Sequence, residues 1–80
     1  MAVVTTFFEN SIERSGRHQT EVDCGWSVVE APSGRLLQLD TFGSSERKIV
    51  GKKSQTLQFD RSAARELLMI LGRAFPDHGS

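Results

Sequence analysis

The amino-acid sequence predicts an α+β fold, in which a four-stranded antiparallel sheet is followed by one C-terminal amphipathic helix (β-β-β-β-α). Up to residue 59, apolar and polar residues alternate in short stretches at the two-residue period of a strand. From residue 61 onward, apolar residues recur at helical spacing. Eighty residues suffice for one domain. We expect it to span 1–80, with the sheet over 3–59, the helix over 61–75 and a short tail over 76–80.

The first strand is predicted in "VVTTFFENSIER", which begins at Val3. Alternate residues from Val4 to Ile12 fall on one face at the period of a strand. Phe8 and Ile12 are also four residues apart, which is a helical spacing, so this strand is less clearly marked than the others. The polar run after it contains Gly16 and indicates a loop.

The second and third strands are predicted to form an antiparallel hairpin over 22–42. The stretch "EVDCGWSVVEA" alternates cleanly, so we expect a half-buried strand whose apolar face includes Trp26. The turn signal "APSG" follows, in which Pro32 fixes its own φ and Gly34 tolerates a positive φ. The next strand is "RLLQLDTF". The residues expected to share the apolar face of the second strand are Val22, Cys24, Trp26 and Val28.

A fourth strand is predicted in "SQTLQFD", and the helix follows it directly. Asp60 is a natural N-cap, because its carboxylate can accept a hydrogen bond from a free N–H of the first turn. Pro76 ends the helix. One helix on four strands makes a thin core, and the helix is apolar over more than half its circumference. We therefore expect a homodimer, with Leu68, Leu71 and Phe75 in its interface.

Composition and charge favour a cytoplasmic protein. The single cysteine, Cys24, cannot form an internal disulfide, and small secreted domains usually contain several. No apolar run approaches the length of a membrane span, and the N-terminus lacks the pattern of a signal peptide.

The net charge is zero, but residues 1–34 sum to −3 and residues 35–53 to +3. This asymmetry indicates either an anionic partner for the middle segment or internal charge pairing.

No grouping of residues predicts catalysis, a metal site or a cofactor. His18 and His78 have no partner at a metal-ligand spacing, and Cys24 is expected to be a small buried residue. The remaining candidate is the basic segment between the third and fourth strands, with Phe42 at its base. An aromatic ring beside a positive track is a common way to hold single-stranded nucleic acid. An ordinary packed ring for Phe42 and a solvated loop remain open alternatives. The residues predicted to bind nucleic acid are Arg35, Phe42, Arg47, Lys48, Lys52 and Lys53.

The segment "RLLQLDTFGSSERKIVGKKSQTLQFDRSAARELLMIL", residues 35–71, resembles the positive-cofactor-four-like family of single-stranded DNA binders, which includes transcriptional coactivators. Phe42 falls at the aromatic position of that family, Gly51 and Lys52 at its "GK" step, and "TLQFD" at its last strand. Asp40 stands where the family usually has a basic residue. The resemblance implies a curved four-stranded sheet, a helix that pairs with its twin in a dimer, and binding of single-stranded nucleic acid across the sheet.

A second hypothesis is a small protein-interaction module, such as a regulator or an inhibitor. The acidic first third, the zero net charge and Asp40 within the expected binding face all favour it. Its partner would dock on the acidic first strand or on the exposed side of the helix. A third hypothesis is an accessory subunit of an enzyme whose chemistry lies elsewhere.

Overall fold

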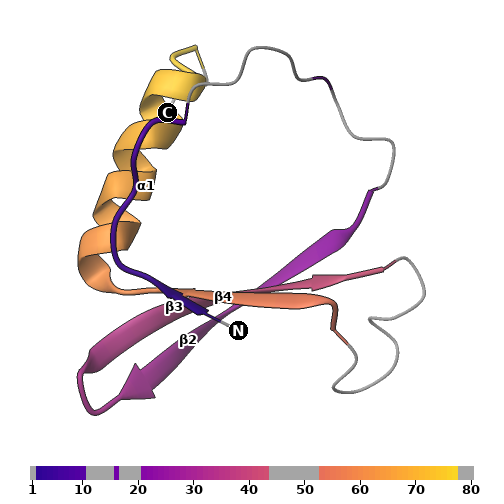
Figure 1. The fold of residues 1–80 in the computed structure, drawn as a ribbon, viewed down its shortest axis with the longest axis vertical. Coiled ribbons are helices and arrows are strands. Elements are labelled where there is room, and N and C mark those ends of the chain that lie inside the picture. Colours follow the sequence, from indigo (N-terminus) through magenta and orange to yellow (C-terminus); the bar gives the residue numbers. More distant parts are fainter. Residues whose placement is uncertain (1, 11–15, 17–20, 44–52, 78–80) are drawn as a thin grey trace.

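The computed structural model describes residues 2–10, 16, 21–43 and 53–77. These residues form one four-stranded sheet and one helix (Figure 1), which confirms the α+β class. The strands lie in the order β1-β4-β3-β2, so β1 and β2 are the two edges. The bounds of the elements are β1 Ala2–Val4, β2 Asp23–Ala31, β3 Gly34–Phe42, β4 Gln55–Phe59 and α1 Arg61–Ala74.

The hairpin of β2 and β3 forms as the alternation and the turn signal predict. The two strands pair antiparallel over their whole length, from Asp23 opposite Phe42 to Ala31 opposite Gly34. Gly34 has a φ of 129°, a conformation that side chains with a Cβ rarely adopt, so the glycine of "APSG" is required there. β4 then pairs antiparallel with β3. These three strands therefore match the predicted antiparallel order.

The sheet is mixed rather than strictly antiparallel, because β1 pairs in parallel with β4. The expectation of a long first strand is also wrong, since β1 ends at Val4, and residues 5–10 are not a strand. The cause lies in β4, which ends at Phe59 opposite Val4, immediately before the chain turns into α1. Beyond Val4 the N-terminal segment has no strand to pair with and runs alongside α1 instead (Figure 1).

Helix α1 begins where its capping residue predicts. The side chain of Asp60 accepts a hydrogen bond from the N–H of Ala63 at 2.8 Å. The helix ends at Ala74, and the N–H of Phe75 donates to the carbonyl of Leu71 at 2.9 Å. Within the described part of the chain, no helix is long and apolar enough to cross a membrane.

Register divides the side chains between two faces of the sheet, since paired residues share a face and neighbours along a strand do not. We name them the apolar face and the polar face. The apolar face comprises Trp26, Val28, Leu37, Leu39, Leu57 and Phe59. The polar face includes Asp23, Gln38, Asp40, Phe42, Thr56 and Gln58, together with the apolar pair Val29 and Leu36.

The core lies where α1 leaves the sheet. Among the described hydrophobic residues, Phe59 and Ala63 are the two that are buried, at 5% and 0% exposure. The ring of Phe7 stacks on that of Phe59, with centroids 6.1 Å apart and planes at 4°. The N-terminal segment and the end of β4 therefore share one aromatic contact close to the start of α1.

The expectation that β2 buries its apolar face is wrong. Trp26 is 73% exposed and Val28 is 52% exposed, and Val22 and Cys24 are exposed as well. The alternation of residues is correct, but α1 packs against β3 and β4, which leaves the β2 side of the apolar face open. A periodic pattern assigns a residue to a face, whereas a packed element must cover that face to bury it.

Candidate functional site

Of the six residues predicted to bind nucleic acid, three lie within the described part of the chain. These are Arg35, Phe42 and Lys53, whereas Arg47, Lys48 and Lys52 lie outside it. Arg35 and Phe42 occupy opposite faces and nearly opposite ends of β3. At about 3.3 Å per residue, seven residues separate them by ~23 Å. The structure therefore does not bring these two residues into one site.

Arg35 forms an ion pair across the hairpin. Its Nε donates to Oε2 of Glu30 at 2.9 Å, and Glu30 is the residue directly opposite on β2. Both side chains are about two-thirds exposed, at 67% and 69%. Exposed pairs of this kind contribute roughly 0–1 kcal/mol, because water screens them. The positive charge of Arg35 is nevertheless opposed locally by a carboxylate.

Lys53 lies beside Asp40, an acidic residue of the polar face. Its Nζ is 3.5 Å from Oδ1 of Asp40, whose side chain is only 14% exposed. Thr56 and Gln38 donate hydrogen bonds to the same carboxylate, and Gln58 donates to Gln38 at 2.9 Å. The hydrogen bonds from Thr56 and Gln38, together with the charge of Lys53, hold the pKa of Asp40 below its ordinary value. The carboxylate of Asp40 therefore has two hydrogen-bond donors and one ion-pair partner, Lys53, at this end of the sheet.

Phe42 is half-buried on the polar face and leans over Gly25 of β2. A Cβ at Gly25 would lie 3.3 Å from Cε1 of Phe42, closer than an ordinary contact. The absent side chain of Gly25 is therefore what lets the ring approach the neighbouring strand.

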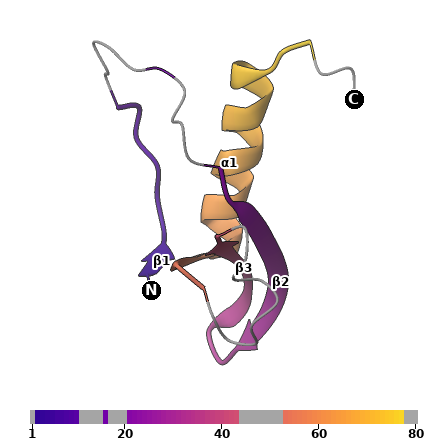
Figure 2. The ribbon, with the colours of Figure 1, turned by 90° about the vertical axis from the view of Figure 1, so that its right-hand side faces the viewer.

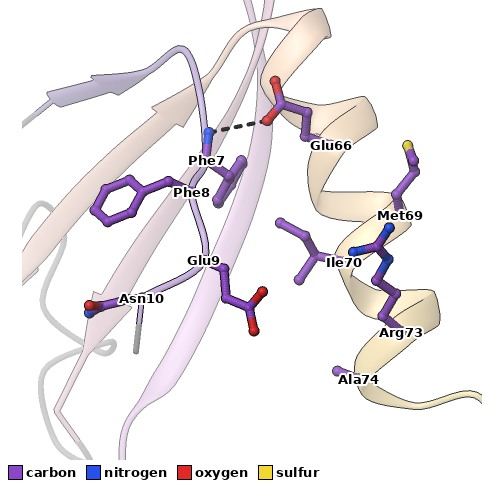
Figure 3. A pocket seen from close by; sticks show the side chains of 9 residues that line it. All are labelled: Phe7, Phe8, Glu9, Asn10, Glu66, Met69, Ile70, Arg73 and Ala74. Atoms are coloured by element: carbon purple, nitrogen blue, oxygen red, sulfur yellow. Dashed lines mark hydrogen bonds between the residues drawn. The ribbon is translucent and has the colours of Figure 1, made fainter. Parts of the chain in front are cut away.

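A cleft separates the N-terminal segment, residues 5–10, from α1 (Figure 3). Its volume is about 640 Å³, within the range of ligand and peptide sites. The N–H of Phe7 donates to Oε1 of Glu66 at 3.1 Å and ties the two walls together at one end. The lining residues are Phe7, Phe8, Glu9, Asn10, Glu66, Met69, Ile70, Arg73 and Ala74.

The walls of this cleft are largely apolar and exposed. Phe8 is 83% exposed, Met69 66% and Ile70 40%. Glu66, Met69, Ile70 and Arg73 have the three- and four-residue spacing of one helical face. The signal in the sequence was the helical spacing of Ile70 and Ala74, but the facing wall comes from a segment that was expected to be a strand.

The residues predicted to form a dimer interface are exposed, two of them on α1 and Phe75 at its C-cap. Leu68 is 71% exposed, Leu71 44% and Phe75 58%. Their spacing of three, four and seven residues places them on one side of the helix. This exposure fits the expected dimer interface but identifies no partner, so the helix-mediated dimer stays a prediction.

Within the described residues, no group of three or more His, Cys, Asp or Glu side chains could hold a metal ion. No protein-family model matches the chain, and neither the curated proteins nor the solved structures include one that is similar to it. The resemblance to the positive-cofactor-four-like family therefore stays a prediction.

Proposed function

We propose that this chain is a protein-interaction module that binds an apolar segment of a partner protein in the cleft between residues 5–10 and α1. The observation that supports it is the excess of uncovered apolar side chains around this cleft. Soluble monomers seldom expose large contiguous apolar patches without a binding role.

The chemistry of the cleft defines the partner. Phe8, Met69 and Ile70 offer contacts for two or three aliphatic or aromatic side chains, as in helix-in-groove recognition. Glu9 and Glu66 outnumber Arg73, so the rim favours a positive charge on the partner. We infer an amphipathic segment with apolar residues at helical spacing and a Lys or Arg beside them.

The test is a pull-down with the tagged chain, followed by calorimetric titration of any stoichiometric protein partner. Met69→Lys should weaken binding by about tenfold or more, because burying a Met side chain contributes roughly 1.5–3 kcal/mol. Met69 is 66% exposed, so the variant should still fold. The matched control is Gln55→Lys, an exposed position on β4 away from the cleft. Equal affinity for both variants would refute the cleft as the binding site.

Single-stranded nucleic acid binding is the second candidate, and one observation favours it. The N–H of Ser54 donates to the carbonyl of Thr41 at 2.8 Å, so β3 and β4 are joined at the end where Phe42 lies. The connecting sequence 44–52 includes Arg47, Lys48 and Lys52 and lies outside the described residues. The internal pairing of Arg35 and Lys53 with carboxylates is why we rank this candidate second.

Fluorescence anisotropy with a labelled oligonucleotide, at low and moderate salt, tests the second candidate. Affinity should fall steeply with salt, because phosphate neutralisation releases counterions. Lys52→Glu should reduce affinity, whereas Lys53→Gln should have a smaller effect because Lys53 already faces Asp40. Absent or salt-independent binding would contradict this candidate and leave the protein-interaction proposal intact.

A further inference from the structure

Strand β2 is an edge strand with features that edges usually avoid. Among the described strands only β3 pairs with it, so the outer edge from Cys24 to Glu30 faces no described strand (Figure 2). β2 is nine residues long and has no Lys, Arg or Pro, whereas β1, at the other edge, has three residues. Natural edge strands are kept short, charged or covered, because an open edge pairs with other chains.

The side chains beside this edge are apolar and uncovered. Trp26 is 73% exposed and Val28 is 52% exposed, and both lie on the apolar face. A strand added at the edge would offer main-chain partners to β2 and side-chain contacts to these two residues. The edge and its apolar neighbours therefore form one surface suited to strand addition.

We propose that the occupant is β2 of a second copy, paired antiparallel about a two-fold axis at Ser27. In this register Trp26 of each copy lies opposite Val28 of the other, and aromatic–β-branched pairs stabilise antiparallel strands. Glu30 lies opposite Cys24 and Asp23 opposite Ala31, so no two carboxylates are directly opposed. Shifting the axis to Val28 would place Trp26 opposite Glu30.

The exposed surface of the chain is large enough for such an interface. It amounts to 7137 Å². A standard interface buries about 800 Å² on each partner. The two copies would form one continuous sheet, and the cleft beside α1 would remain open on each.

Sedimentation equilibrium of the intact chain and two variants tests the interface. The wild type should dimerise, and Trp26→Lys should raise the dimer Kd by about 2- to 30-fold, because the two-fold symmetry means that two Trp–Val pairs are lost. Leu68→Lys is the matched control, since Leu68 is 71% exposed and lies on α1. Circular dichroism checks that both variants fold. A wild type that stays monomeric at about 100 μM, or a dimer lost only with Leu68→Lys, would overturn the proposal.

Cross-linking tests the register and does not depend on the Trp26 variant. In a Cys24→Ser background, Ser27→Cys places two thiols opposite each other at the axis. Opposed residues of antiparallel strands have Cα atoms about 4.5–5.5 Å apart, which a disulfide can span. Mild oxidation should give a covalent dimer for Ser27→Cys and little for Ser62→Cys, an exposed control on α1. Equal cross-linking of the two, or none at Ser27→Cys, would overturn the Ser27-centred pairing.

Discussion

Replacing Phe59 by Ala should remove a large part of the stability of this domain. The ring is 5% exposed, so it buries about 95% of its area. For an aromatic side chain of ~200 Å², burial at ~25 cal/mol per Å² gives a gross value of about 4–5 kcal/mol. The methyl group of the alanine retains part of this burial free energy, whereas the stacking of the ring on Phe7 is lost. We expect a net loss of ~3–5 kcal/mol in the free energy of unfolding, as for other buried Phe→Ala changes.

Phe8→Ala is the matched control, because it makes the same chemical change one residue from Phe7. Phe8 is 83% exposed, so it buries only ~35 Å² of a ring of ~200 Å². The same area coefficient gives less than about 1 kcal/mol. The two variants should therefore differ by ~3 kcal/mol although they have identical composition.

The assay is urea denaturation followed by far-UV circular dichroism, at one fixed protein concentration. If Phe59→Ala does not fold, Phe59→Leu provides a milder version, with an expected loss of ~1–2 kcal/mol. Equal losses for Phe59→Ala and Phe8→Ala would refute the reasoning. That result would mean that the Phe7–Phe59 contact does not organise the core.

Three further predictions follow from single residues. Asp60→Ala should cost ~1 kcal/mol of stability in thermal unfolding, because the hydrogen bond to the N–H of Ala63 is lost, whereas Asp60→Asn should retain most of it. The pKa of Asp40 is lowered in the folded state, chiefly by the hydroxyl of Thr56, so its contribution to stability is present above the unfolded pKa of about 3.9 and is lost as pH falls through the lower folded value. Asp40→Asn should flatten the pH dependence of unfolding in that acidic range. Gly34→Ala should cost ~1–2 kcal/mol in urea denaturation, since the φ of 129° strains any residue with a Cβ.

Local patterns predicted the parts of the fold that depend on neighbours in sequence. The turn at Gly34 fixed the β2–β3 hairpin, and the change to helical spacing after Asp60 located α1 within one residue at its C-terminal end. These elements are encoded by period, cap and turn residues that lie within a few positions of one another. They needed no knowledge of the rest of the chain.

The position of β1 could not be predicted in the same way. Its length and direction are set by β4, more than fifty residues later, whose end at Phe59 limits the pairing. The residues near Val4 in the sequence do not indicate where β4 ends. The alternation in "VVTTFFENSIER" therefore indicated a longer strand than the sheet can accept.

The candidate site was predicted only in part, because exposure and pairing depend on tertiary contacts. Trp26 was assigned to the correct face, but the coverage of that face depends on where α1 packs. The ion pair of Arg35 with Glu30 follows from the register of the hairpin. Ala31 pairs with Gly34 beside the turn, so the next pair away from the turn is Glu30 with Arg35. The cleft beside α1 required the path of residues 5–10, which periodicity misassigned.

The parallel pairing of β1 with β4 also constrains the order of folding. β2, β3, β4 and α1 are consecutive and can assemble through short loops, whereas β1 must close a loop of about fifty residues to reach Leu57. Loop-closure entropy grows with length, so this contact should form last and open first. The N-terminal segment can then detach while the β2–β3 hairpin stays intact, which exposes Phe59 and removes one wall of the cleft. Amide hydrogen exchange at residues 2–7 would register such openings as faster exchange than in β3.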